Sequence, residues 1–285
     1  MSNNIINSHI DSLIKAALDE DLDDVGDLTS QSLFQQDTLG KFKLISKSNG
    51  IISGIPVFKR VYDIIDKNSE INFFIKEGTV VKDSTLIAEL KGNLLSLLKG
   101  ERISLNFLQR LSGISTLTNK FVEKIAHTNT KILDTRKTTP GYRYLEKYAV
   151  KQGGGFNHRF GLYDMILIKE NHITAAGGIV NAITYCLDWI NKNEVDIKIE
   201  VEVQNCEQIK EIIHFPIHRI MLDNFSLLSI EEAVKLINTT CEVEVSGNIT
   251  LDNVQKVAET GVDYISVGCL THSSESLDIS MLLYK

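Results

Sequence analysis

The sequence predicts an α/β protein in two parts: a small α+β domain over residues 1–113 and a reduced, parallel α/β barrel over residues 114–285. Three observations lead to this prediction. The length of 285 residues suits one large domain or two ordinary ones. Short apolar runs separated by turn residues fill the first part. Strand-like and helix-like segments then alternate from about residue 131 onward, as in a parallel sheet.

The first part is expected to open with a helix over residues 8–18, where apolar side chains recur at helical spacing and Ser8 is a suitable N-cap. Strands of a mostly antiparallel sheet are expected at 42–45, 51–55, 71–75 and 79–90, with a helix at 57–65. A long helix follows over 94–125, and Gly113 is a candidate break within it.

The second part contains six short strand-like runs, at 132–133, 165–168, 197–203, 220–222, 243–245 and 264–267. Helical segments separate them, at 142–152, 176–191, 206–214, 230–238 and 251–259. Because a complete eight-stranded barrel needs about 250 residues, we expect a reduced barrel of six or seven strands. The last residues of the chain are candidates to pack back on the N-terminal domain.

The expected strands end at a polar residue or a glycine: Asp134, Lys169, Glu202, Asp223, Ser246 and Gly268. The carboxyl ends of barrel strands meet at one rim, where active sites form. Segments 197–203 and 241–246 also alternate charged and aliphatic residues. Charges that face a barrel interior require a cationic partner or ligand. The alternative interpretation is a solvated edge strand.

The charge balance narrows the classes of partner. The chain carries 30 Lys and Arg against 37 Asp and Glu, a net charge of −7, which argues against a surface that tracks nucleic acid or anionic lipid. Residues 134–172 nevertheless hold seven cations and four acids (+3), so the rest of the chain is at −10. A cationic segment in an acidic chain indicates a site for a small polyanion.

The remaining composition points to a cytoplasmic protein with no membrane partner. Its four cysteines, Cys186, Cys206, Cys241 and Cys269, have neither zinc-ligand nor disulfide-framework spacing, so reduced thiols are expected. The N-terminus lacks the basic flank and apolar run of a signal peptide, and no apolar stretch approaches the ~18 residues of a membrane span.

Within the cationic segment, the side chains differ in their expected roles. Arg143, Lys147 and Lys151 recur every four residues on one expected helix, which favours a solvated helix face. Arg136, Lys137 and Lys169 lie just beyond strand ends, which favours a functional role. Glycine turns at 246–248 and 267–269 close the last two strands, where barrels commonly hold a phosphate.

Several motifs together resemble the signature of the quinolinate phosphoribosyltransferases, also called nicotinate-nucleotide pyrophosphorylases (carboxylating). In the second part they are Asp134-Thr-Arg-Lys-Thr-Thr-Pro-Gly141, Leu145-Glu-Lys-Tyr-Ala149, Gly153-Gly-Gly, Asn157-His-Arg159, Gly161-Leu-Tyr-Asp164, Ile168-Lys-Glu-Asn-His172, Glu200-Val-Glu-Val203, Ile220-Met-Leu-Asp-Asn224 and Gly261-Val-Asp-Tyr-Ile-Ser-Val-Gly268. In the first part they are Gly26-Asp-Leu-Thr-Ser30 and Glu101-Arg-Ile-Ser-Leu-Asn-Phe-Leu-Gln-Arg-Leu-Ser-Gly113. The resemblance runs in order from about residue 8 to the C-terminus.

This resemblance implies a type II phosphoribosyltransferase with an α/β sandwich followed by a TIM-like barrel. It implies Mg²⁺-dependent transfer of phosphoribose from phosphoribosyl pyrophosphate (PRPP) to quinolinate, giving nicotinate mononucleotide, CO₂ and pyrophosphate in de novo NAD biosynthesis. It also implies a homodimer, with a higher oligomer as the alternative, in which Arg102 enters the neighbouring subunit's site.

The resemblance also implies the roles of individual residues. Those matching substrate-binding positions are Arg102, Thr135, Arg136, Lys137, His158, Arg159, Lys169, Glu202, Asp223, Ser246, Gly247, Asn248, Val267, Gly268 and Cys269. The expected catalytic groups are Lys137, Lys169, Glu202 and Asp223. Glu202 and Asp223 are also the expected Mg²⁺ ligands, directly or through the substrate. His127, His214, His218 and His272 receive no role.

Two alternatives stay open from the sequence. A relative found with molybdate-transport genes shares the fold and part of the Asp134–Lys137 motif, although Arg102 and Asn157-His-Arg159 favour the quinolinate enzyme. The second is a non-catalytic carrier or binding module, because residues 77–87 resemble half of a biotinyl or lipoyl carrier hairpin. No lysine occupies a recognisable hairpin-tip motif there, which favours ordinary sandwich strands.

Overall fold

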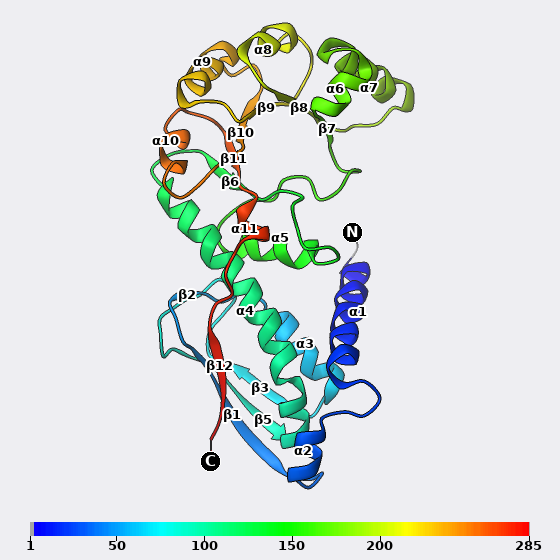
Figure 1. The fold of residues 1–285 in the computed structure, drawn as a ribbon, viewed down its shortest axis with the longest axis vertical. Helices are drawn as coiled ribbons and strands as arrows, with labels where there is room; N and C mark the ends of the chain where they lie inside the picture. The colour runs from blue at the N-terminus through cyan, green and yellow to red at the C-terminus, as the bar shows by residue number, and fades with distance from the viewer. Residues whose placement is uncertain (1–2, 285) are drawn as a thin grey trace. The chain divides into compact units, whose positions relative to one another are not determined.

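The structure, a computed structural model, describes residues 3–284 and falls into two compact units. Unit 1 comprises Met1–Leu117, Thr139–Gly154 and Ser273–Lys285, and unit 2 comprises Thr118–Thr138 and Gly155–His272. Each unit therefore combines segments that are distant in the sequence (Figure 1).

Unit 1 is built on a four-stranded antiparallel sheet in the order β12-β1-β5-β3. Its strands are β1 (Leu39–Ser46), β3 (Glu70–Phe73), β5 (Leu86–Asn93) and β12 (Ile279–Leu283), and a separate pair joins β2 (Gly50–Ile51) to β4 (Val80–Val81). The helices of this unit are α1 (Asn3–Leu22), α2 (Leu28–Leu33), α3 (Ile55–Ile65) and α5 (Arg143–Gln152), and α4 (Leu94–Lys124) begins in it. The C-terminal strand is thus an edge strand of this sheet, antiparallel to β1.

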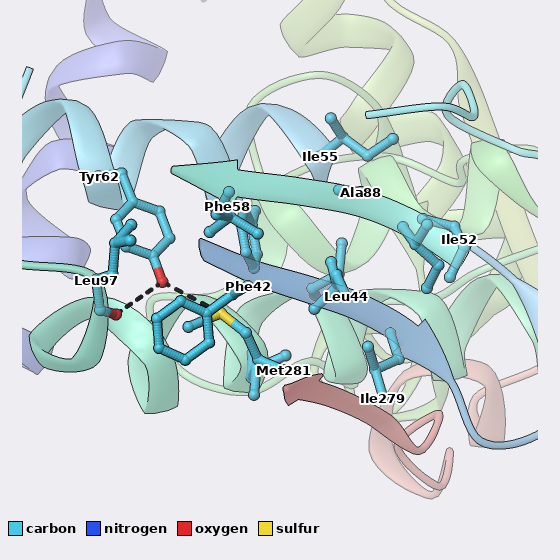
Figure 2. Packing of buried hydrophobic residues seen from close by; sticks show 14 of the residues in the cluster. Phe42, Leu44, Ile52, Ile55, Phe58, Tyr62, Ala88, Leu97, Ile279 and Met281 are labelled. Carbon is cyan, nitrogen blue, oxygen red and sulfur yellow. Dashed lines mark hydrogen bonds between the residues drawn. The ribbon is translucent and has the colours of Figure 1, made fainter. Parts of the chain in front are cut away.

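The core of unit 1 lies between this sheet and helices α3 and α4. Figure 2 shows Phe58 and Tyr62 of α3 packed over strand residues such as Phe42 and Leu44, all of them buried. The Tyr62 hydroxyl lies 3.2 Å from the Leu97 carbonyl oxygen, to which it donates a hydrogen bond, so its polar end is satisfied inside the core.

The run predicted as one strand over 79–90 is two strands, β4 and β5, so that prediction was wrong in detail. The segment between them is a turn in which Ser84 adopts a left-handed backbone (φ 66°) and the Thr85 N–H donates to the Lys82 carbonyl. Lys82, Asp83 and Ser84 provide the turn chemistry that interrupts the apolar pattern.

The break expected at Gly113 does not occur, because α4 continues from Leu94 to Lys124. A Cβ atom at Gly113 would lie 1.8 Å from the Glu275 carbonyl oxygen. The glycine therefore lets the C-terminal segment approach the helix closely instead of ending it.

The solvated helix face expected for Arg143, Lys147 and Lys151 is wrong at its central residue. Lys151 is exposed and Arg143 is half-buried, but Lys147 is only 1% exposed. Its neighbours Leu145, Glu146, Ala149 and Val150 are buried as well, so α5 is enclosed around most of its circumference and no face at Lys147 meets solvent.

Unit 2 contains the predicted parallel sheet, with six strands in the order β6-β11-β10-β9-β8-β7. The strands are β6 (Lys131–Leu133), β7 (Ile166–Ile168), β8 (Ile199–Val203), β9 (Arg219–Asp223), β10 (Glu242–Ser246) and β11 (Tyr264–Ser266). Strands β7 to β11 pair in sequence order and β6 closes onto β11, which is barrel order with the ring open between β6 and β7. An isolated parallel bridge joins Phe156 to Leu133 of β6.

Helices α6 (Glu170–Ala176), α7 (Ile179–Asn193), α8 (Cys206–Ile212), α9 (Leu227–Ile237) and α10 (Val254–Ala258) lie outside the curved sheet, and α11 (Cys269–His272) follows β11 (Figure 1). The helix predicted at 176–191 is divided by Gly177 (φ 77°) and Gly178 (φ 137°), so its first residue belongs to α6. Among the described residues no single helix is long and apolar enough to cross a membrane; α6 and α7 meet that test only as a pair bent by 89°.

Candidate active site

A cavity of about 760 Å³ lies at the carboxyl ends of the unit 2 strands. Of the residues predicted for the site, it is lined by Thr135, Arg136, Lys137, His158, Arg159, Lys169, Glu202, Asp223, Ser246, Gly247, Asn248, Val267, Gly268 and Cys269. They gather here because parallel strands end at the same rim. Arg102 is the one predicted residue that belongs to unit 1.

Cationic side chains occupy the part of the wall formed by β6, β7 and the loop before β7. Arg136 and Arg159 are close enough that burial first, and the Arg136 charge second, lower the pKa of the Arg159 guanidinium. Arg159 Nη1 donates to the Met165 carbonyl oxygen at 3.0 Å, which fixes the position of the guanidinium. Two guanidinium groups held together repel unless an anion lies between them, and a carboxylate matches their geometry.

Acidic side chains lie at the carboxyl ends of β8 and β9. Glu202 and Asp223 lie near the ends of these two paired strands. Lys169 Nζ lies 2.5 Å from Glu202 Oε2, so the cation that follows β7 is already ion-paired with the acid of β8. The cavity therefore has a cationic side and an acidic side that meet at this pair.

Strands β10 and β11 end in tight turns, as the sequence predicted. Gly247 and Asn248 both have left-handed backbones, with φ of 96° and 54°. On the other side, Thr271 Oγ1 donates to the Lys137 carbonyl oxygen at 2.8 Å and ties α11 to the loop after β6. A Cβ atom at Gly268 would come within 3.2 Å of both Lys137 and His272, so this turn is closely packed.

Beneath the cavity lies a buried ionic cluster, of which the sequence predicted only a part. Glu200 of β8 and Glu244 of β10 are both 0% exposed. His158 Nε2 lies 3.0 Å from Glu200 Oε2 and 3.5 Å from Glu244 Oε1, and Arg219 Nη1 lies 2.7 Å from Glu244 Oε2. Burial raises the pKa of both carboxyl groups. Because β8 and β10 are interior strands of the sheet, the solvated-edge interpretation of these charges is wrong.

The neighbours of His158 fix the orientation of its ring. The Arg159 backbone N–H donates to His158 Nδ1 at 2.7 Å, so the ring carries its proton on Nε2, toward Glu200. The His158 backbone N–H donates to Asp134 Oδ1 at 2.9 Å, and Asp134 is buried. The nitrogen of His158 and the carboxylate oxygens of Glu200 and Glu244 are spaced closely enough to hold a metal ion, but the Arg219 guanidinium already supplies a cation to Glu244.

Several residues that line the cavity were not predicted from the sequence: Leu167, Met221, Ile249, Thr250, Ser266 and His272. His272 had a usable signal, since it lies one helical turn after Gly268. Arg219 had none, because its contact with Glu244 depends on the register that places Arg219 beside Glu242 across β9 and β10.

Arg102 is exposed on α4 and lines a separate hollow of about 270 Å³ in unit 1, together with Glu20, Asp21 and Tyr142. Its expected role in a neighbouring subunit stays a prediction.

Comparisons with known proteins agree with the two-part organisation. Sequence models of the quinolinate phosphoribosyl transferase family match residues 27–112 (N-terminal domain) and 114–282 (C-terminal domain). The chain belongs to the quinolinate phosphoribosyltransferase family. The type II phosphoribosyltransferase fold expected for the family is confirmed by the parallel and antiparallel sheets described above.

Similar proteins cover nearly the whole chain. A probable nicotinate-nucleotide pyrophosphorylase (carboxylating) of Bacillus subtilis is 45% identical over 262 residues, covering 91% of this chain and 89% of the relative. A chloroplastic nicotinate-nucleotide pyrophosphorylase (carboxylating) of Arabidopsis thaliana is 38% identical over 284 residues, covering 94% and 81%. The solved structure of the nicotinate-nucleotide pyrophosphorylase from Francisella tularensis has a TM-score of 0.92 at 41% identity, covering 98% and 97%.

Membership in this family favours the quinolinate enzyme over the relative found with molybdate-transport genes. The carrier-hairpin alternative also fails on strand pairing, because β4 pairs with β2 whereas β5 pairs with β1 and β3. The segment at residues 77–87 is therefore no carrier hairpin. Glu77 instead accepts a hydrogen bond from the Gly54 N–H at 2.8 Å, at the start of α3.

Proposed function

We propose that this protein transfers phosphoribose from PRPP to quinolinate with loss of CO₂, producing nicotinate mononucleotide and pyrophosphate for NAD biosynthesis. The observation that carries the proposal is a cavity with one pair of arginines on one side and two carboxylates on the other, in a chain whose quinolinate phosphoribosyltransferase domains span residues 27–282.

Quinolinate has two adjacent carboxylates, so its site needs convergent cations. Arg136 and Arg159 are proposed to hold these carboxylates, with Lys169 contributing a further positive charge. Bound in this way, the pyridine nitrogen is presented to C1 of the ribose. After the bond between them forms, the positively charged ring accepts the electron pair released when the C2 carboxylate leaves as CO₂. No protein side chain needs to act as a nucleophile.

The acidic side is proposed to face the ribose. Glu202 and Asp223 would stabilise positive charge that builds on the sugar as pyrophosphate departs. Because Lys169 is ion-paired with Glu202, the acceptor and donor halves of the site are connected through one contact. Lys137 is proposed to stabilise the departing pyrophosphate. The turns at 246–248 and 267–269 are proposed to hold the 5′-phosphate.

Mg²⁺ is proposed as the cofactor. The donor set fits it, because Glu202 and Asp223 offer carboxylate oxygens on adjacent strands at the edge of the cavity, and hard oxygen ligands are what Mg²⁺ prefers. When bound, the ion would neutralise charge on the pyrophosphate.

We further propose that the protein acts in the cytoplasm as a homodimer in which Arg102 completes the partner's site. The support is the exposure of Arg102 on α4 and its match to the family's shared-site arginine. If an Arg102→Ala protein is mixed with a Lys169→Ala protein, random exchange should restore about a quarter of the wild-type activity, because half of the dimers then carry one intact site. No recovery after verified subunit exchange contradicts the shared site.

The reaction is tested by offering the purified protein PRPP and Mg²⁺ with quinolinate, nicotinate or nicotinamide. Of these three acceptors, only quinolinate should be converted to nicotinate mononucleotide. The Arg136→Ala protein should lose at least about a hundredfold in kcat/KM for quinolinate, because a charge-assisted contact to a substrate carboxylate is removed. Arg60, ion-paired with Asp11 in unit 1, provides a matched control, and Arg60→Ala should retain activity. Turnover of another heterocycle without turnover of quinolinate would overturn the proposal.

A further inference from the structure

Asn224 directly follows Asp223 at the end of β9 but does not line the main cavity. It lines a neighbouring hollow of about 200 Å³ between the loops that follow β9 and β10. Its backbone is left-handed, with φ of 57°, which is uncommon for a residue other than glycine. Backbone conformations of this kind are often found at functional sites, where the side chain has a specific role.

The side-chain amide of Asn224 joins two parts of the candidate site. Its Nδ2 donates to Asp223 Oδ2 at 2.8 Å, and its Oδ1 accepts from Asn248 Nδ2 at 2.9 Å. A carboxylate only accepts hydrogen bonds, so the orientation of the amide is determined by its contact with Asp223. The Asn224 backbone N–H also donates to the Ser246 carbonyl oxygen at 2.9 Å.

The connection continues through a second asparagine pair. Asn253 Nδ2 donates to the Asn248 carbonyl oxygen at 2.9 Å, and Asn253 Oδ1 accepts from the Thr250 N–H at 2.9 Å. Three asparagine side chains thus connect the acid at the end of β9 to the turn after β10 and to the start of α10.

The Asn224 side chain also packs closely against Gly247. A Cβ atom at Gly247 would lie 2.2 Å from Asn224 Oδ1 and 2.7 Å from Asn224 Cγ. The turn can therefore have its present shape beside Asn224 only with glycine at this position. The shape of the turn and the position of the Asn224 amide depend on each other.

We propose that Asn224 is a positioning residue for the phosphoribosyl donor: it keeps the Asp223 carboxylate in register with the 246–248 turn. The inference rests on the proposed function, in which Asp223 faces the ribose and the turn holds the 5′-phosphate. These two groups bind opposite ends of one sugar phosphate, so their separation determines how well the donor fits.

Few residue types can fill this position. Glycine adopts the left-handed backbone but has no side chain, aspartate lacks the donor for Asp223, and glutamine places its amide one methylene farther away. Asparagine combines tolerance of a positive φ with a donor and an acceptor on a short side chain.

The test compares direct binding of PRPP and of quinolinate, each in the presence of Mg²⁺, by calorimetry on the purified protein. Asn224→Gly keeps the backbone conformation accessible and removes the amide. It should weaken PRPP binding by about tenfold, the effect of losing a hydrogen bond to a charged group, and change quinolinate affinity less than about twofold. Equal weakening of both ligands, or no change in PRPP binding, would overturn the proposal. Asn238, an exposed left-handed asparagine (φ 42°) after α9, is the matched control, and Asn238→Gly should leave both affinities unchanged.

A double-mutant cycle tests the contact itself. Gly247→Ala should weaken PRPP binding strongly in the wild-type background. In the Asn224→Gly background the two closest obstructing atoms are gone, so the same substitution should have an effect at least about fivefold smaller. The strain of alanine at a positive φ is common to both backgrounds and cancels. Strictly additive effects contradict the coupling. Wild-type protein that binds PRPP but does not turn over quinolinate would refute the proposed acceptor while leaving this inference testable.

Discussion

Removing Arg219 should expose how unit 2 tolerates two buried carboxylates. The Arg219 guanidinium contacts Glu244 at 2.7 Å and Glu242 at 2.9 Å, and its Cζ lies 3.9 Å from the centre of the Tyr264 ring. In Arg219→Met, the methionine fills much of the space but carries no charge. His158 Nε2, at 3.0 Å from Glu200 and 3.5 Å from Glu244, then remains beside the two buried carboxylates.

The size of the stability loss follows from how deeply each ion-pair partner of Arg219 is buried. Glu244 has no exposed surface, and breaking such a buried pair by removing one partner costs about 3–5 kcal/mol of unfolding free energy. The Glu242 side chain is 37% exposed, so its contact contributes less than about 1 kcal/mol. We expect a loss of about 3–5 kcal/mol, most of it from Glu244.

The loss should depend on pH. Burial already raises the pKa of Glu244, and Arg219 opposes that shift, so Arg219→Met raises the pKa further. A carboxyl group whose pKa is raised in the folded state takes up a proton on folding. Its contribution to stability is therefore complete at low pH and is lost as the pH rises through the folded-state pKa. The destabilisation should be smaller at about pH 5 than at about pH 8.

The assay is urea unfolding followed by the fluorescence of Trp189. This is the one tryptophan in the sequence, and it lies half-exposed on α7 in unit 2, so it reports on the unit that contains Arg219. Adding Glu244→Gln to Arg219→Met should recover part of the lost stability, because the unpaired charge is removed. Lys210→Met, which removes a surface pair with Glu207 in the same unit, should leave the midpoint unchanged. A loss below about 1 kcal/mol, or an equal loss at both pH values, would refute the reasoning.

Three further results are expected. Gly113→Ala should release the C-terminal segment from α4, because its Cβ would overlap the Glu275 carbonyl; faster proteolysis after residue 272 would show this, and unchanged digestion would contradict it. Glu77→Ala should lower the protection of the Gly54 amide in hydrogen exchange by removing the acceptor at the start of α3, whereas equal protection would argue against that hydrogen bond. Chelation of divalent ions should abolish turnover and added Mg²⁺ should restore it, while full activity in excess chelator would contradict the proposed cofactor.

Much of the fold could be predicted because its signals are local. The six barrel strands stand out as apolar runs followed by a polar residue or glycine, and the rim at which they converge follows from parallel pairing. The alternation around Glu200 and Glu244 likewise predicted charges inside the sheet, and the structure places both carboxylates there. The local sequence pattern was sufficient to predict the elements whose structure depends on residues close together in the sequence.

The predictions failed where contacts between residues far apart in the sequence determine the role of a residue. Gly113 was a candidate helix break, but its role is set by Glu275, far along the chain. Lys147 has the spacing of a solvated face, yet the packing around α5 buries it. Asn224 lies inside the motif Ile220-Met-Leu-Asp-Asn224, but its hydrogen bond to Asn248 depends on the register of β9 and β10. Spacing in one segment carries no information about such register.

The most direct test of the central claim is the stoichiometry of the reaction with quinolinate labelled in its C2 carboxylate. With PRPP and Mg²⁺, each nicotinate mononucleotide formed should be accompanied by one labelled CO₂ and one pyrophosphate, and Arg136→Ala should suppress all three together. Pyrophosphate release without labelled CO₂, or no product from quinolinate, would contradict the account.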